Sequence, residues 1–136
     1  MATFGTSTLL ASGPSKQVTW GATVAVGDTV YLDTATDTYK LADGDSSAAT
    51  ALGAGVAVSG GVTGSPGIIA TAGARLSGCS GLVPGQIYCV GSTAGSIEAH
   101  SALTEDTDYV SIVAVALTSS TAIVILVNSG VLLNLA

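Results

Sequence analysis

The chain has 136 residues, which fits one compact domain, and only 9% of them are charged, against roughly 25% in an average soluble domain. Three basic residues stand against nine acidic ones, and the formal net charge is −6. Because nucleic-acid binding requires clustered Lys or Arg side chains that displace counterions, this balance excludes DNA and RNA as expected partners.

The N-terminal segment, residues 1–20, is predicted to be an arm outside the folded domain. It is rich in Thr and Ser and nearly free of charge, so it buries too little apolar surface to fold alone. Its backbone is nevertheless suited to adding as a strand to the edge of a partner's sheet. It has no basic region followed by a continuous apolar run, so it does not resemble a secretory signal, and the chain is expected to be made and kept inside a cell at first.

Residues 21–136 are predicted to form a single all-β domain, either a small β-barrel or a β-sandwich. Gly, Ala, Ser, Thr and Val dominate, and strong helix formers are too few for amphipathic helices. Residues 42–51 are expected to be a loop or at most one helical turn. The longest apolar run, Ala122–Val127, is far shorter than the roughly 20 residues of a membrane-spanning helix, so no membrane contact is expected. Between turn signals the β-rich runs are "VTWGATVAV", "TVYLDT", "TYKLA", "GAGVAVS", "GIIATAG", "GQIYCVG", "GSIEA", "YVSIVAVAL" and "TAIVILVN".

An internal repeat is indicated when residues 24–73 are placed over residues 81–130 without a gap. The low-complexity composition also raises chance identity, but the match predicts two similar four-strand units, packed face to face or closed into one barrel. The identities include Val26 with Val83, Tyr31 with Tyr88, Ala42 with Ala99, Ile68 with Ile125, Gly73 with Gly130, and Val56-Ala57-Val58 with Val113-Ala114-Val115.

The polar residues suggest no catalytic, cofactor or metal site. His100 beside Ser101 could be imagined in a triad, but no G-x-S-x-G elbow occurs and the surrounding "HSALTEDTD" is typical of a solvated loop. Its acidic residues Glu105, Asp106 and Asp108 could bind a cation where subunits meet on an axis, although an acidic turn is the favoured interpretation. Asp43-Gly44-Asp45 lacks the spacing of a calcium loop and predicts a turn, as does Pro84-Gly85.

The two cysteines, Cys79 and Cys89, have the spacing of neither a paired zinc knuckle nor a disulfide-dense scaffold. They are predicted to be free or half-buried thiols, with a small loop disulfide as the alternative.

The second half of the chain carries a recognisable set of short motifs: Gly81-Leu82, Pro84-Gly85, Tyr88, Gly95-x-Ile97, Asp108-Tyr109-Val110 and the strand Val113–Leu117. These motifs resemble a pattern found in structural proteins of tailed bacteriophages, especially small capsid decoration (cement) proteins and some tail-associated ones. The first half, "VAVGDTVYLDT" through "GAGVAVSG", is similar to the same proteins, in which a G-D-x-V strand precedes a G-x-A strand. The chain departs from the pattern at Cys89 and at its apolar tail. The resemblance implies a β-tulip-like domain without catalytic residues.

The resemblance therefore implies a non-enzymatic cement protein that binds the major capsid protein on the outer surface of the head lattice. It is expected to be a homo-oligomer, with a trimer favoured, assembled in the host cytoplasm and located on the exterior of the virion. The hairpin Val110–Gly130 is expected to supply core on one face and a protomer contact on the other.

The capsid-binding residues are expected in the arm, and the protomer interface in the apolar tail. The alternatives are a phage tail or fibre subunit and, from another class, a carbohydrate-binding module, which the small number of aromatic residues disfavours. The predicted arm contacts are Thr3, Phe4, Thr6, Thr8, Leu9 and Leu10, and the predicted interface residues are Val131, Leu132, Leu133 and Leu135.

Overall fold

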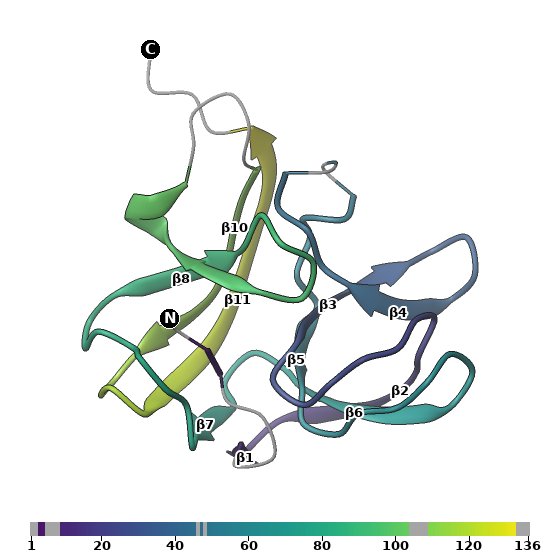
Figure 1. Ribbon diagram of the computed structural model, residues 1–136, viewed down its shortest axis with the longest axis horizontal. Helices are drawn as coiled ribbons and strands as arrows, with labels where there is room; N and C mark the ends of the chain where they lie inside the picture. The colour runs from purple at the N-terminus through teal and green to yellow at the C-terminus, as the bar shows by residue number, and fades with distance from the viewer. Residues whose placement is uncertain (1–2, 5–8, 46, 48, 104–108, 133–136) are drawn as a thin grey trace.

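A computed structural model describes residues 3–4, 9–45, 47, 49–103 and 109–132 of the chain. It contains eleven strands in two antiparallel sheets, and the only helical segment among the described residues is the short 3-10 turn η1 (His100–Ala102). The two sheets form a sandwich-like arrangement and not a closed barrel (Figure 1). The all-β prediction is confirmed, and the sandwich is the form adopted.

The five-stranded sheet belongs to the first half of the chain, and the six-stranded sheet belongs mostly to the second half. In the first sheet the order is β2-β6-β5-β3-β4, and in the second it is β1-β7-β11-β10-β8-β9. The first sheet comprises β2 (Ser15–Thr19), β3 (Thr29–Asp33), β4 (Thr38–Leu41), β5 (Gly55–Ala57) and β6 (Pro66–Ala70). The second comprises β1 (Leu10–Ser12), β7 (Arg75–Ser77), β8 (Ile87–Val90), β9 (Ile97–Ala99), β10 (Tyr109–Ala116) and β11 (Thr121–Leu132).

The two predicted repeats share a strand order. The order β6-β5-β3-β4 in the first sheet recurs as β11-β10-β8-β9 in the second, so residues 24–73 and 81–130 have the predicted common topology. The equivalence also includes strands outside the predicted repeat, because β2 pairs with β6 just as β7 pairs with β11. We call β2 to β6 the first unit and β7 to β11 the second unit.

The two units are not superimposed by an ungapped alignment, however. In the first unit the Gly27 N–H donates to Ala57 O at 2.8 Å, and the Ala57 N–H donates to Asp28 O at 2.8 Å. In the second unit the same two bonds run from Gly85 to Ala116 O at 2.8 Å and from Ala116 to Gln86 O at 3.0 Å. Ala57 therefore corresponds to Ala116, and its predicted match with Ala114 is wrong.

The shift between the units arises in two places. At the turn before β8 it is one residue, since Gly27 corresponds to Gly85, and at Ala57 and Ala116 it is two residues. Before Ala116, β10 carries one additional residue relative to β8, because Ile112 pairs with Cys89 but Ala114 pairs with Tyr88. The turn before β8 is as predicted, since Gly85 has φ +81 and the Gln86 N–H donates to Val83 O at 3.0 Å.

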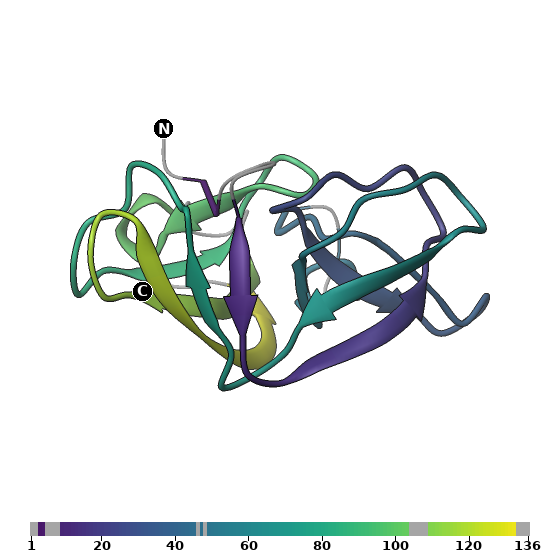
Figure 2. The same cartoon turned by 90° about the horizontal axis from the view of Figure 1, so that it is seen from below.

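Residues 9–20 are part of the domain, so the prediction of a separate arm is wrong for the described part of that segment. β1 pairs with β7 and β2 pairs with β6, which makes one ribbon that crosses from sheet to sheet (Figure 2). The ribbon bends where Gly13 and Gly73 adopt φ +102 and +95, conformations that glycine permits. A segment with few apolar residues folds here because the neighbouring sheets supply most of the buried surface.

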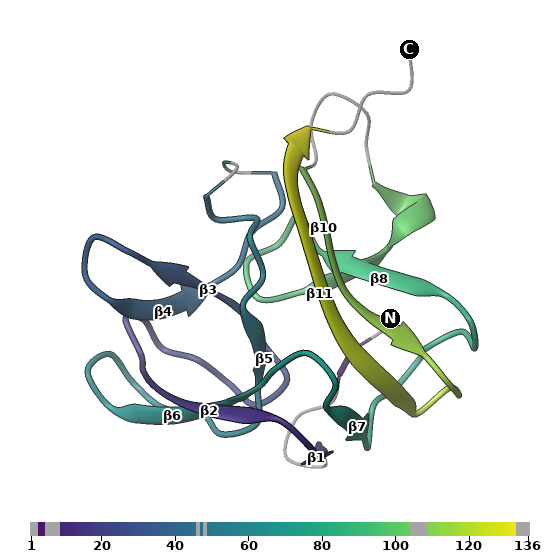
Figure 3. The same ribbon diagram turned by 180° about the vertical axis from the view of Figure 1, so that it is seen from behind.

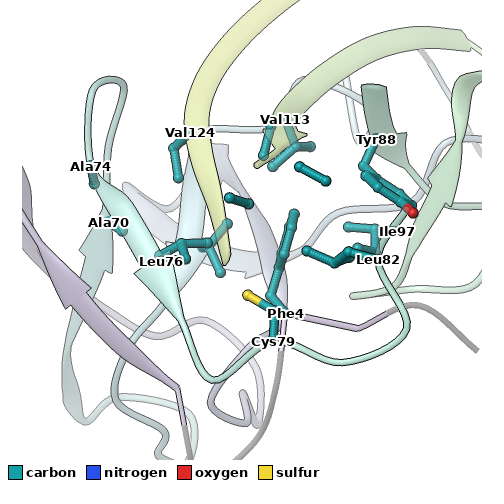
Figure 4. Packing of buried hydrophobic residues seen from close by; sticks show 14 of the residues in the cluster. Phe4, Ala70, Ala74, Leu76, Cys79, Leu82, Tyr88, Ile97, Val113 and Val124 are labelled. Carbon is teal, nitrogen blue, oxygen red and sulfur yellow. The ribbon is translucent and has the colours of Figure 1, made fainter. Parts of the chain in front are cut away.

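Each unit has its own hydrophobic core. In the first unit Trp20 is fully buried over Gly67, where any Cβ would overlap the indole ring. The core of the second unit also contains Val56 and Ala70 from the first unit and Phe4 and Leu9 from the N-terminal segment (Figure 4). The first core comprises Val18, Trp20, Val24, Val30, Tyr39, Ala57 and Ile69.

Phe4 supplies the second core with an aromatic ring from outside the second unit. Cys79 of that unit, whose N–H donates to Ser120 O at 2.9 Å, is much smaller than the Trp20 indole that fills the first core. The ring of Phe4, which is 1% exposed, lies beside Cys79 within the second core (Figure 4).

The loop after β4 joins the two units. The described residues between 42 and 51 lie in no strand or helix, as predicted, and the loop lies beside the open end of the β10–β11 hairpin (Figure 3). The Gly44 N–H donates to Gly91 O at 2.7 Å, and the Tyr109 N–H donates to Gly44 O at 2.8 Å. A Cβ at Gly44 would lie 2.7 Å from Val90 O, so only glycine permits this approach.

Candidate functional site

The strongest candidate for a functional surface is the side of the six-stranded sheet that faces away from the core. Along β10 and β11 the side chains alternate between the two faces of the sheet. Ala114, Ala116, Ala122 and Val124 are buried in the second core, and the residues between them point outward.

Six of the outward-facing residues are large and apolar, and we call these six the outer face. Exposed fractions are 54% for Val127, 38% for Leu117 and 37% for Ile87, and the other members are partly exposed. The strand register places Ile87, Val115 and Ile123 in one row across β8, β10 and β11, and exposed Arg75 of β7 continues that row. The outer face comprises Ile87, Val115, Leu117, Ile123, Ile125 and Val127.

The two-faced hairpin predicted from the sequence is therefore present. Nearly every position of "TAIVILV" is apolar, because one set of side chains packs in the core and the other covers the outward side.

The predicted capsid-binding residues of the arm do not form one surface. Thr3 makes an antiparallel bridge to Ser80, and Phe4 and Leu9 are buried in the second core at 1% and 6% exposure. These two apolar side chains are therefore not available to a capsid, since they fill the domain's own core. Leu10 in β1 is 69% exposed, and Thr6 and Thr8 lie outside the described residues.

The predicted tail interface begins inside the sheet. Val131 and Leu132 belong to β11, and their backbones pair with Val110 and Tyr109 of β10. Leu133 and Leu135 lie outside the described residues.

A groove of about 400 Å³ lies between β2 and β4, the two edge strands of the first sheet. Lys16 crosses it, with Nζ donating to the Tyr39 hydroxyl at 2.9 Å and lying 5.5 Å from the centre of the Tyr39 ring. The hydrogen bond to Tyr39 raises the pKa of the Lys16 ammonium above its usual value. No motif in the sequence indicated this groove, because it depends on how far the sheet curls. Its lining is Lys16, Gln17, Val18, Thr19, Leu32, Asp37, Tyr39 and Pro66.

The polar residues that the sequence raised as catalytic or cation-binding candidates lie in separate segments of the chain. His100 and Ser101 are exposed in η1, and Glu105, Asp106 and Asp108 lie outside the described residues. The Asp45 N–H donates to Asp43 Oδ1 at 3.2 Å, which is the geometry of a local turn.

Both cysteines are free and buried, as the favoured interpretation predicted. Burial raises the pKa of each thiol to about 11, and for Cys89 the carboxylate of Glu98 adds to the effect. Such thiols remain protonated at neutral pH and are poor nucleophiles.

Two further observations concern only the part of the chain that the structure describes. No group of three or more His, Cys, Asp or Glu side chains there is placed to hold a metal ion. No helix there is long and apolar enough to cross a membrane.

Neither the comparison with protein-family models nor the comparison with curated proteins found a match for this chain.

Proposed function

We propose that this protein is a capsid decoration protein of a tailed bacteriophage, which binds the outer surface of the head lattice as a homo-oligomer, with a trimer as the favoured form. Its partner is the major capsid protein. It acts without catalysis, by burying surface between neighbouring subunits of the shell.

The observation that carries this proposal is the outer face. Monomeric proteins rarely expose a contiguous set of large apolar side chains, and such a set commonly marks a contact with another protein. Complete burial of one Val, Leu or Ile side chain stabilises a complex by about 1.5–3 kcal/mol, and the side chains of the outer face are already partly buried, so each offers a fraction of that amount. Together the six side chains offer an apolar surface for a contact between protomers.

The carbohydrate-binding module fits the structure less well. Sugar sites generally present exposed aromatic rings beside polar groups. All six aromatic residues are described, and none of them is among the exposed residues: Phe4, Trp20, Tyr39 and Tyr88 are buried, and Tyr31 and Tyr109 are partly exposed.

The oligomer is tested with a matched pair of substitutions, Val127→Glu on the outer face and Val62→Glu on a distant loop. Both valines are well exposed, at 54% and 63%, so neither change should unfold the domain. Light scattering after size exclusion should give a trimer for the wild type and for Val62→Glu, and mostly monomer for Val127→Glu. A wild type that is monomeric at high concentration, or a Val127→Glu oligomer of unchanged size, would contradict the proposal.

The location is tested by electron cryo-microscopy of the parent particle. We expect density for the two-sheet domain on the outer surface of the head. Density confined to the tail would contradict a decoration protein and would support the alternative function, a tail or fibre subunit.

A further inference from the structure

The outer edge of β2 carries backbone groups that point away from its own sheet. The Trp20 N–H donates to Ser65 O at 2.9 Å, and the Thr71 N–H donates to Pro14 O at 3.1 Å, which fixes the phase of the β2–β6 ladder. Since alternate residues of an antiparallel strand bond to opposite sides, Lys16 and Val18 bond to β6, and Ser15 and Gln17 direct their N–H and C=O groups away from it. Among the residues that the structure describes, no strand pairs with these groups.

In the second unit the corresponding strand edge is covered by an additional strand. Its strand β7 is the counterpart of β2, and the outer edge of β7 is covered by β1, which pairs antiparallel through Leu10 with Ser77, Ala11 with Leu76 and Ser12 with Arg75. The same sheet topology therefore holds an additional edge strand in one unit and, in the described residues, lacks it in the other.

The space beside the edge of β2 is the groove between β2 and β4. One end is closed where Trp20 bridges to Tyr39 and the Gly21 N–H donates to Tyr39 O at 2.8 Å. β2 and β4 run parallel at this bridge, so an inserted strand can be antiparallel to both. The volume of about 400 Å³ lies within the range of about 300–1,000 Å³ typical of ligand sites.

The charge in the groove favours a carboxylate on the added strand. Lys16 is exposed, and its ammonium uses one donor on the Tyr39 hydroxyl, which leaves two donors for a ligand. The nearby Asp37 also interacts with Lys16, but no ion pair between them forms within the 4.0 Å that defines one. The other lysine of the first unit, Lys40, is already paired with Asp33 at 2.7 Å.

We propose that the β2 edge of the first unit is a strand-addition site for an extended, carboxylate-bearing segment of a partner protein. The segment pairs antiparallel with β2 through the backbones of Ser15 and Gln17, and its carboxylate lies against the Lys16 ammonium. This site lies on the first unit and the outer face lies on the second, so it does not depend on capsid binding.

The site is tested with three short synthetic probes that differ at one central position, acetyl-TVTETVT-amide and its Gln and Lys versions. Backbone amide spectra of the full chain should show shifts centred on residues 15–17, and hydrogen exchange at Ser15 and Gln17 should slow when peptide is bound. An exposed ion pair changes affinity by only a few-fold, so we expect the Glu probe to bind roughly threefold more tightly than the Lys probe. The Lys16→Gln variant should abolish that preference.

Two substitutions at one position separate backbone pairing from side-chain contact. Gln17→Pro removes the outward N–H and is tolerated at a strand edge, and Gln17→Ala removes only the side chain. We expect loss of binding for the first and retention for the second. If Gln17→Pro does not fold, hydrogen exchange at Ser15 and Gln17 of the wild type still shows whether the peptide pairs with the β2 edge.

Three results would overturn the proposal. The first is unchanged exchange at Ser15 and Gln17 with millimolar probe, and the second is equal loss of binding in the Pro and Ala variants. The third is slowing of the same two amides with protein concentration alone, which would identify a second copy of this chain as the occupant.

Discussion

Phe4 shows at the scale of single residues how two similar units are filled differently. Trp20 occupies the first core from its own unit, and the chain has no second tryptophan to fill the second core. Phe4 is brought in from the N-terminal segment to complete that core. A core must be filled at close-packed density, but the chain is free to supply the ring from any segment that reaches the cavity.

Replacing Phe4 with Ala should therefore destabilise the domain. Removing a fully buried aromatic ring costs about 3–5 kcal/mol, since the cavity it leaves cannot close completely. Leu10→Ala is the control, because Leu10 is 69% exposed and should cost less than about 1 kcal/mol. Urea unfolding measures both, and equal effects would show that Phe4 does not fill the core.

The buried thiols predict a loss of stability at alkaline pH. Burial raises the pKa of Cys79 and Cys89 from 9.0 to about 11, so the folded state holds these protons after the unfolded state has released them. The free energy of unfolding should fall as the pH rises from about 9 to 11, by on the order of 2 kcal/mol per thiol at most.

The double variant Cys79→Ala/Cys89→Ala isolates this effect. Tyrosines and lysines titrate in both proteins, so only the difference between the two pH profiles belongs to the thiols. Identical slopes from pH 9 to 11 would contradict the assignment.

At the scale of elements, β6 is shaped by the tryptophan that lies across it. Gly67 is buried near the start of β6, and the indole of Trp20 occupies the space where a side chain would be. Glycine is unfavourable in strands, because it has no side chain to pack, and it is accepted here since the ring supplies the packing.

Gly67→Ala should destabilise the domain by about 1–3 kcal/mol, because the new methyl group overlaps the ring. Combined with Trp20→Leu, the loss should be smaller than the sum of the single losses, as expected for residues in contact. Ile68→Ala, at the neighbouring position of 44% exposure, is the control and should cost less than about 1 kcal/mol. Additive losses in the double variant, measured by urea unfolding, would rule out the contact as the cause.

At the scale of the whole molecule, the two units are one cooperative structure. Val56 and Ala70 of the first unit pack in the second core, and the loop after β4 is hydrogen bonded to Gly91 and Tyr109. The β1–β2 and β6–β7 segments form a continuous ribbon between the sheets. Loss of the first unit would therefore expose the second core, and loss of the second unit would expose Val56 and Ala70 of the first.

This coupling predicts a single unfolding transition. Trp20 is the only tryptophan and reports on the first unit, whereas far-UV circular dichroism reports on both. The two probes should give one midpoint in urea, and Val56→Ala should lower it for both probes by about 2 kcal/mol in free energy. Separate midpoints would show that the units unfold independently.

The amino-acid sequence by itself determined the all-β class and the common strand order of the two halves. These features depend on local composition, and on strand-and-turn patterns that recur at a similar spacing in residues 24–73 and 81–130. The two-faced β10–β11 hairpin was also predictable, since a run in which both alternating positions are apolar must cover two surfaces.

Only the tertiary structure decided the roles of the N-terminal segment and of the edge of β2. The sequence of residues 1–20 is polar and weakly patterned, so nothing local shows that Phe4 and Leu9 enter a core built by residues 74–124. The groove between β2 and β4 likewise depends on the curl of the sheet and on the Trp20–Tyr39 bridge. Core filling and open strand edges depend on contacts between residues far apart in the chain. A local sequence pattern therefore does not identify which distant segment fills a core or covers an edge.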